Sequence, residues 1–195
     1  MNQEPENRGL TLTLDLATST GWALCDGQQI THSGVVKFVT PKGGDVYDAV
    51  VSFDAWLTQL GQTHTIREML WERVDFCSFA SAFATHHRLL TTAVWWAKRN
   101  GILYFGIPLS THREHCGLKS GDKLGAIEYA RRRFGIEPKT DDEADALCMS
   151  ACVIDGKIDE LPGLLEESAA KKKMKTDAKR KATLARKAAQ AAGKA

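Results

Sequence analysis

Apolar and polar residues alternate with a period of two near the start of the chain. The stretch LTLTLDL, residues 10–16, follows this period and predicts a β-strand. The next stretch, GWALCDGQQ, contains the turn signal Asp26-Gly27, and ITHSGVVKF provides a third strand. Because short connections favour antiparallel pairing of consecutive strands, we expect these three strands to form a meander.

Helical and strand-like segments follow one another in the rest of the chain. Apolar residues at helical spacing predict a helix over residues 46–60, and MLWERV, residues 69–74, predicts a short strand in a βαβ arrangement. The last helix opens with Thr140 as N-cap and Glu143 three residues later, which is typical of a capping box. The other predicted elements are a helix at 81–101, a strand at 102–109, a basic loop at 111–123 and a helix at 123–135. The resulting order, β-β-β-α-β-α-β-α-α, predicts an α/β fold with a mixed sheet flanked by helices.

Composition is that of an ordinary soluble globular protein, with 43% hydrophobic and 26% charged residues. The first residues are polar, without a basic start followed by an apolar signal core, and no apolar run is long enough to span a membrane. We therefore expect no membrane partner and a cytoplasmic location, in a bacterium or a phage-infected cell. The five cysteines are an odd number without a CxxC pair. They are therefore expected to be small apolar residues in a reducing compartment rather than a disulfide framework.

The small net charge of +2 conceals a strong asymmetry. Residues 168–195 contain ten Lys or Arg and one acid, a net charge of +9, and the rest of the chain carries −7. We expect an N-terminal extension at residues 1–9, one folded domain at residues 10–165, and a disordered, basic, low-complexity tail at residues 166–195. The tail is interpreted as a nonspecific DNA-phosphate clamp through Lys171, Lys172 and Lys173, or else as a solubilising end.

Four acidic residues occupy positions that are unusual for a charged group. Asp15 and Glu72 lie in otherwise apolar strands, and Asp142 and Asp145 project from one face near a helix start. A buried carboxylate is costly unless it is paired or binds a cation. Carboxylates suit Mg²⁺ or Mn²⁺, and two such ions about 4 Å apart promote phosphodiester hydrolysis. The alternative is that Asp15 merely ends a strand and that Asp142 and Asp145 cap a helix.

Three motifs resemble those of the RuvC-type Holliday junction resolvases, most closely the phage-type members. LDLATSTGWAL resembles their first motif, WERV their second and DDEADAL their last, in the same order over residues 10–155. The resemblance implies a ribonuclease H-like fold with a five-stranded sheet and two Mg²⁺ ions per site, which Mn²⁺ would replace. It also implies that Asp15, Glu72, Asp142 and Asp145 are the ligands and that Asp15 bridges the ions. Asp142 is chosen because the family pattern has two residues between the two acids, and Asp141 is the alternative.

The resemblance also assigns residues around the carboxylates. Lys119 and Lys123, in the basic loop, are expected to contact DNA phosphate and to assist catalysis. Phe76 is the candidate for an aromatic wedge at the junction centre. Two-fold junction symmetry favours a homodimer, formed through the helix that carries Trp95 and Trp96, one of them in the core. His112 and His115 are expected at the surface or facing phosphate rather than binding metal.

These observations predict a crossover junction endodeoxyribonuclease that acts on branched DNA. One alternative is a ribonuclease H that cleaves RNA–DNA hybrids, and another is a non-catalytic DNA-binding protein that assists recombination. ATPases of the sugar-kinase or chaperone type share the first strand motif, but they need a second lobe and a much longer chain than 195 residues. The preferred DNA sequence and the range of branched substrates stay open.

Overall fold

The computed structural model describes residues 9–40, 42–45, 47–74 and 80–160. One compact unit ends at Gly156, and a second begins at Lys157 with the short 3₁₀ helix η1. The predicted domain boundary at residue 165 and the basic tail lie outside the described residues. The elements of the first unit are β1 (Leu10–Asp15), β2 (Ser19–Cys25), β3 (Ile30–Lys37), α1 (Asp48–Thr63), β4 (Ile66–Arg73), α2 (Ala80–Arg99), β5 (Leu103–Pro108), α3 (Leu109–His115), α4 (Lys123–Phe134) and α5 (Asp141–Ile154).

The strands form one five-stranded mixed sheet in the order β3-β2-β1-β4-β5. β1, β2 and β3 pair antiparallel, which confirms the predicted meander, whereas β4 pairs parallel with both β1 and β5. The parallel pairing follows from the helices α1 and α2, which act as crossover connections between these strands. The predicted α/β architecture with a mixed sheet is confirmed.

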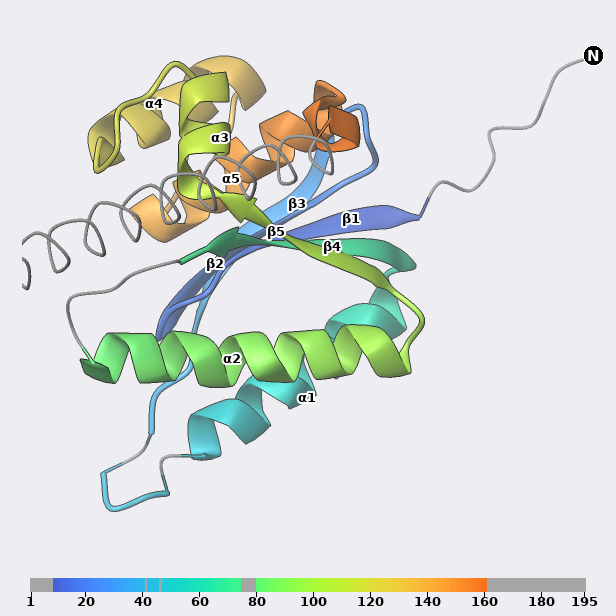
Figure 1. The fold of residues 1–195 in the computed structure, drawn as a ribbon, viewed down its shortest axis with the longest axis vertical. Helices are drawn as coiled ribbons and strands as arrows, with labels where there is room; N and C mark the ends of the chain where they lie inside the picture. Colours follow the sequence, from blue (N-terminus) through green and yellow to red (C-terminus); the bar gives the residue numbers. More distant parts are fainter. Residues whose placement is uncertain (1–8, 41, 46, 75–79, 161–195) are drawn as a thin grey trace, which may run out of the picture. The chain divides into compact units, whose positions relative to one another are not determined.

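Helices cover both faces of the sheet. In Figure 1, α1 and α2 lie on one face, and α5 lies on the other together with α3 and α4. β1 shows how the sequence creates two unlike faces, because successive side chains of a strand point to opposite sides. Leu12 and Leu14 belong to the large apolar core with α1 and α2, whereas Thr13 hydrogen-bonds with α5. We call these the apolar face and the α5 face of the sheet.

Several element boundaries differ from the sequence-based prediction. The expected basic loop at residues 111–123 begins inside a helix, α3, which runs from Leu109 to His115. That prediction was wrong because the Lys, Arg and His residues were interpreted as loop-forming, although the first glycine after β5 is Gly117. Strand β4 begins at Ile66, three residues before the predicted start.

The structure also bears on the predictions about membrane spans and cysteines. Among the described residues, no helix is long and apolar enough to cross a membrane. Four of the five cysteines, Cys25, Cys116, Cys148 and Cys152, are buried thiols, as expected for small apolar residues. Cys77 lies outside the described residues.

Candidate active site

Asp15 and Glu72 lie at the carboxyl ends of neighbouring parallel strands. The register places Leu14 of β1 opposite Trp71 of β4, so the next residues along the two strands are Asp15 and Glu72. Asp15 shares the side of Thr13, two residues earlier, which contacts α5. Trp71 packs against the apolar core, so Glu72 points to the opposite side, the α5 face. The sheet therefore directs both carboxylates toward α5.

Helix α5 approaches this part of the sheet closely. The Thr13 hydroxyl donates to the carbonyl of Ala146 at 2.9 Å and lies 2.8 Å from the hydroxyl of Ser150. Gly21 lies opposite Asp15 in β2, and a Cβ atom on Gly21 would overlap the backbone carbonyl of Asp142. Only glycine fits this contact. The contact brings the beginning of α5, with its acidic residues, beside Asp15.

Three of the acidic residues at the start of α5, Asp141, Glu143 and Asp145, have different partners. Thr140 caps the helix by accepting from the backbone N–H of Glu143. The Glu143 carboxylate is buried and accepts from the Ser33 hydroxyl at 2.7 Å and from the backbone N–H of Lys139 at 2.9 Å. The predicted capping box is therefore only half formed, because Glu143 reaches residue 139 instead of the N-cap.

Asp141 forms an ion pair with Lys123 of α4. This contact favours Asp142 over Asp141 as the member of the carboxylate cluster, since a side chain held by lysine is less available to a metal ion. Asp145 lies one helical turn along α5 and contacts Arg113. The choice between Asp141 and Asp142 as ligand stays a prediction.

Burial and neighbouring acidic charges raise the pKa values of two of the carboxylates, Asp15 and Asp145. The pKa of Asp15 lies well above its ordinary value, first because the group is buried and then because the charges of Glu72, Asp145, Asp142 and Asp141 repel its ionised form. Burial also raises the pKa of Asp145 to about 6, against the opposing charge of Arg113. Such mutual repulsion is the electrostatic signature of a site that a cation would stabilise.

The donor set fits a hard divalent cation in its chemistry. Carboxylate oxygens from β1, β4 and α5 are the ligands that Mg²⁺ and Mn²⁺ prefer. Among the described residues, no three acidic, His or Cys side chains are arranged closely enough to hold one ion as they stand. The role of the four carboxylates as ligands of a common ion therefore stays a proposal.

Helix α3 brings two further charged or polar side chains to the carboxylates. Nε2 of His112 lies 3.1 Å from Oε2 of Glu72, and Nη2 of Arg113 lies 2.5 Å from Oδ1 of Asp145. Both α3 side chains are almost fully buried. The expectation that His112 lies at the surface is wrong, because α3 packs against β5 and α5 and turns this residue inward. His115, by contrast, is partly exposed and contacts Asp155.

The other residues with predicted roles lie further out. Lys119, in the segment between α3 and α4, and Lys123, the first residue of α4, are both exposed, on the same side of the sheet as α5. Trp96 is in the core with 2% of its surface exposed, whereas Trp95 is 65% exposed, as predicted for one buried and one outward-facing indole. Phe76, Lys171, Lys172 and Lys173 lie outside the described residues.

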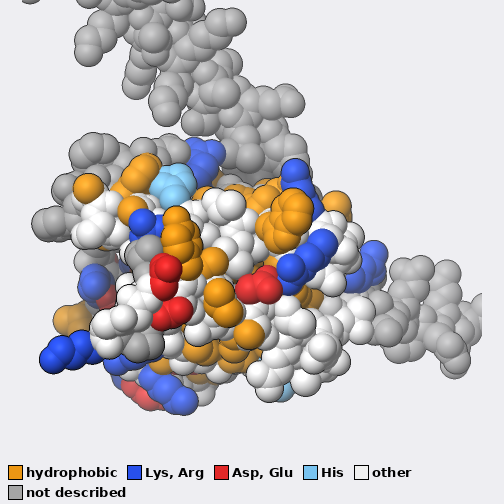
Figure 2. All heavy atoms as spheres, turned by 90° about the horizontal axis from the view of Figure 1, so that it is seen from below, with side chains coloured by type: hydrophobic (Ala, Val, Ile, Leu, Met, Phe, Trp, Pro, Cys, Tyr) orange, Lys and Arg blue, Asp and Glu red, His pale blue; other side chains and the backbone are white. Residues whose placement is uncertain are grey.

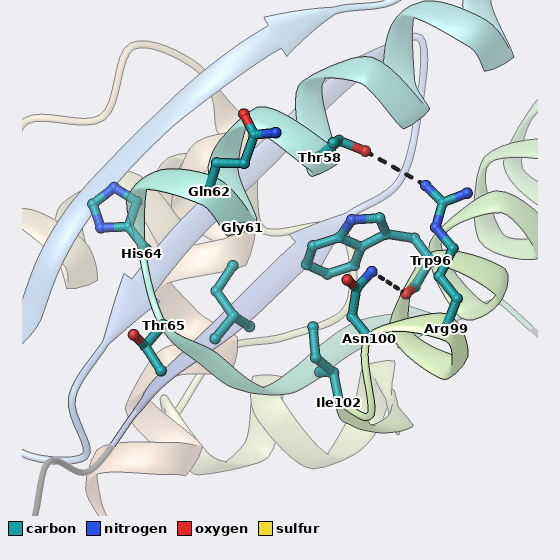
Figure 3. Close-up of a pocket in the computed structure, with 10 residues that line it drawn as sticks. Thr58, Gly61, Gln62, His64, Thr65, Trp96, Arg99, Asn100 and Ile102 are labelled. Atoms are coloured by element: carbon teal, nitrogen blue, oxygen red, sulfur yellow. Dashed lines mark hydrogen bonds between the residues drawn. The ribbon is translucent and has the colours of Figure 1, made fainter.

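A pocket of about 540 Å³ lies elsewhere, where the last turns of α1 and α2 meet the beginning of β4 (Figure 3). Several polar side chains along its wall already have protein partners. Arg99 donates to Asp54 and to the Thr58 hydroxyl, and the Asn100 amide donates to the carbonyl of Trp96. No residue of the carboxylate cluster lines this pocket, so it is separate from the candidate active site.

The fold is that of the RuvC-type Holliday junction resolvases, a form of the ribonuclease H-like fold. RuvC of Thermus thermophilus in complex with a Holliday junction substrate matches at a TM-score of 0.62 and 16% identity, over 72% of this chain and 89% of that one. A second Thermus thermophilus RuvC structure matches at 0.60 and 16%, over 71% and 89%. The yeast mitochondrial Holliday junction resolvase Ydc2 matches at 0.55 and 10%, over 75% and 79%.

At the level of sequence, no protein-family model matches the chain. No curated protein matches it either. The likeness to these solved structures therefore establishes the fold, and the resemblance to phage-type members stays a prediction.

Two residues near the carboxylates, His112 and Arg113, carried no clear signal in the sequence, whereas Gly21 did. His112 and Arg113 were interpreted as part of a basic loop, and the seven residues of α3 are too few for a helical period that would have indicated that they point inward. Gly21 belongs to LDLATSTGWAL, the stretch that resembles the first motif. A glycine in a strand often marks a close backbone approach, which is its role here.

Proposed function

We propose that this chain is a metal-dependent endonuclease that cuts four-way DNA junctions and related branched DNA. The observation that carries the proposal is the gathering of Asp15, Glu72, Asp142 and Asp145 at one edge of the α5 face. Asp15 and Glu72 end neighbouring parallel strands, and the close contact at Gly21 brings the start of α5 beside them. The fold is shared with RuvC, whose solved complex contains a Holliday junction.

The four carboxylates would hold two Mg²⁺ ions, with Mn²⁺ as a substitute. When bound, such ions activate a water molecule and stabilise the attacking and leaving oxygens of the phosphodiester. Asp15, whose ionised form is disfavoured by the charges of Glu72, Asp145, Asp142 and Asp141, would be the ligand shared by the two ions, as the family resemblance implies. Lys119 and Lys123 would bind the adjacent phosphates, and the product would carry a 5′-phosphate, as the family resemblance implies.

Residues outside the described part of the structure complete the proposal. Phe76 follows Glu72 by four residues and would stack on bases opened at the junction centre. Lys171, Lys172 and Lys173 belong to the +9 segment and would add nonspecific phosphate contacts that weaken with salt.

A homodimer would place two such sites on a junction with two-fold symmetry. Trp95 lies on the outer side of α2 with 65% of its surface exposed, so its indole is accessible to a partner. Figure 2 views the layer of α1 and α2 from outside and shows hydrophobic side chains reaching the surface, with acidic side chains confined to a few small groups. We place the dimer contact on this surface of α2.

A substrate panel tests the proposed activity. Purified protein with Mg²⁺ is expected to cut a labelled four-way junction at paired, symmetric positions and to leave linear duplex and RNA–DNA hybrid intact. The matched control is Asp15→Asn, which removes one charge without changing side-chain size. Cleavage of the hybrid alone would instead establish a ribonuclease H activity. Junction binding without cleavage under any divalent ion would favour a DNA-binding accessory protein.

A further inference from the structure

Two consecutive residues of α3, His112 and Arg113, contact two carboxylates from different elements. Nε2 of His112 lies 3.1 Å from Glu72 of β4, and Nη2 of Arg113 lies 2.5 Å from Asp145 of α5. The His112 side chain is fully buried and that of Arg113 is 5% exposed, so neither is free to contact a phosphate of DNA. Their role must therefore be exerted through the carboxylates.

Both side chains of α3 contact only one of the two oxygens of the carboxylate that they face. His112 faces Oε2 of Glu72, and Arg113 donates to Oδ1 of Asp145. Because a carboxylate has two oxygens, each acid keeps the other for a cation while its rotamer is held. Hydrogen bonds from neighbouring groups to ligating carboxylates commonly orient metal ligands in this way.

Arg113 also connects the carboxylates to the segment that carries the predicted DNA-binding lysines. Its Nη1 donates to the backbone carbonyl of Asp122 at 2.9 Å. Asp122 is the N-cap of α4 and immediately precedes Lys123. One guanidinium group therefore ties the start of α4 to Asp145 of α5.

We propose that His112 and Arg113 are positioning residues that fix the orientations of Glu72 and Asp145 for metal binding. This inference rests on the proposed metal-dependent function, but it concerns residues to which neither the sequence motifs nor the comparisons assign a role. His112 donates its Nε2 proton to Glu72, because an ionised carboxylate only accepts hydrogen bonds. Arg113 holds Asp145 with one arm of its guanidinium and the start of α4 with the other.

Binding of Mn²⁺ to the full-length protein without DNA, measured by electron paramagnetic resonance, tests the proposal. His112→Ala and Arg113→Lys are expected to weaken Mn²⁺ binding by about 10- to 100-fold, the usual effect of removing such supporting groups. His112→Gln is expected to recover most of the affinity, because its amide nitrogen reaches the place of Nε2. Arg113→Lys keeps the charge but cannot donate to both Asp145 and the Asp122 carbonyl.

The chain offers matched controls that contact an acid away from the carboxylate cluster. His115 lies on the same helix and pairs with Asp155, as does Arg133 of α4. His115→Ala and Arg133→Ala are expected to bind Mn²⁺ as the wild type does. Junction cleavage at saturating DNA adds a second readout, in which kcat falls in the His112 and Arg113 variants, KM for DNA is unchanged, and added Mg²⁺ restores the rate.

The possible results separate the two proposals. If the wild type binds Mn²⁺ and His112→Ala and Arg113→Lys bind it equally well, the positioning role is wrong while the metal site stands. If the wild type itself does not bind Mn²⁺, the proposed function fails, and the positioning role fails with it. Should His112→Ala not fold, as judged by circular dichroism, Arg113→Lys still decides the matter, because unchanged Mn²⁺ binding by that variant would show that the positioning role is wrong.

Discussion

On the apolar face of the sheet, α1 and α2 bury large side chains such as Phe53, Leu57 and Trp96 against the leucines of β1. On the α5 face, the buried residues of the helix are mostly small, and β1 presents Thr13 and Asp15 instead of leucine. The same strand therefore supplies a hydrophobic core to one side and polar contacts to the other. The first side stabilises the fold, and the second brings charged groups together.

On the α5 face, the close packing brings carboxylates together, and their burial and mutual repulsion lower the stability of the fold. Small side chains let α5 approach the sheet closely, so that its acidic first turn lies beside Asp15. The resulting repulsion and burial raise the pKa of Asp15 and of Asp145. A group of carboxylates that destabilises the fold is expected where function requires it rather than where packing does.

Replacing one glycine by alanine on each side of the sheet is expected to give the largest difference between the two faces in stability and in cleavage. On the α5 face, Gly21→Ala would drive a Cβ into the Asp142 backbone, and we expect a loss of about 3 kcal/mol of stability together with loss of cleavage. On the apolar face, Gly61→Ala would bring a Cβ to 2.8 Å from Cζ2 of Trp96, a side chain that can adjust. Urea unfolding and junction cleavage would measure both.

Gly61 lies within α1, where alanine is favoured by about 1 kcal/mol, so we expect Gly61→Ala to change stability little and cleavage not at all. Equal losses of cleavage in the two variants would contradict the assignment of function to the α5 face alone.

Removing a buried group from each face should change stability in opposite directions. Leu57→Ala would leave a cavity in the apolar core and is expected to cost about 2–5 kcal/mol. Asp15→Asn would remove a repelled charge, and we expect it to stabilise the protein at pH 7 in EDTA. A gain of about 1 kcal/mol would raise Tm by about 2–4 °C.

The stability gained by Asp15→Asn is expected to depend on pH. Because the pKa of Asp15 is higher in the folded protein than in the unfolded chain, the folded state binds more protons, and stability falls as pH rises above about 4. The advantage of Asp15→Asn should therefore vanish at pH 4. Thermal unfolding at several pH values checks this, and a destabilised Asp15→Asn at pH 7 would show that Asp15 is not repelled.

A charge placed on the outer surface of α2 or of α4 is expected to affect the oligomeric state differently. Trp95→Glu on α2 is expected to convert the proposed dimer to a monomer, because a charge cannot be buried there without a partner. Leu124→Glu on α4, where the leucine is 80% exposed, serves as the matched control and is expected to leave the dimer intact. Analytical ultracentrifugation measures both, and a monomeric wild type would refute the dimer.

The smallest expected effect concerns a single lysine on each side of the sheet. Lys119→Gln should lower the slope of log affinity against log salt by about 1, the value for one lost phosphate contact. Lys98→Gln, in the last turn of α2, should leave the slope unchanged. Junction binding at several salt concentrations would show this, and equal slopes for all three proteins would place Lys119 away from DNA.

The sequence predicted the fold where hydrophobic periodicity was strong. The three-strand meander, the parallel β4 and the long helices follow from period-two and helical spacing, and the structure confirms them. Asp15 and Glu72 stood out because a carboxylate interrupts an apolar strand. Their shared position at one sheet edge follows from the parallel pairing of β1 and β4.

The sequence was least informative between β5 and α4. A short helix such as α3, with seven residues, has too few turns for a clear hydrophobic period. His112 and Arg113 therefore resembled solvent-exposed basic residues. Their burial depends on how α3 packs against α5, which is a tertiary property that local pattern does not encode.

A crystal of the protein soaked in Mn²⁺ and measured at a wavelength with strong manganese anomalous scattering would test the central claim most directly. We expect two anomalous peaks about 4 Å apart, the separation of paired catalytic ions, with oxygens of Asp15, Glu72, Asp142 and Asp145 around them. Peaks only at other surface acids, or a carboxylate cluster without bound manganese at saturating concentration, would contradict the account.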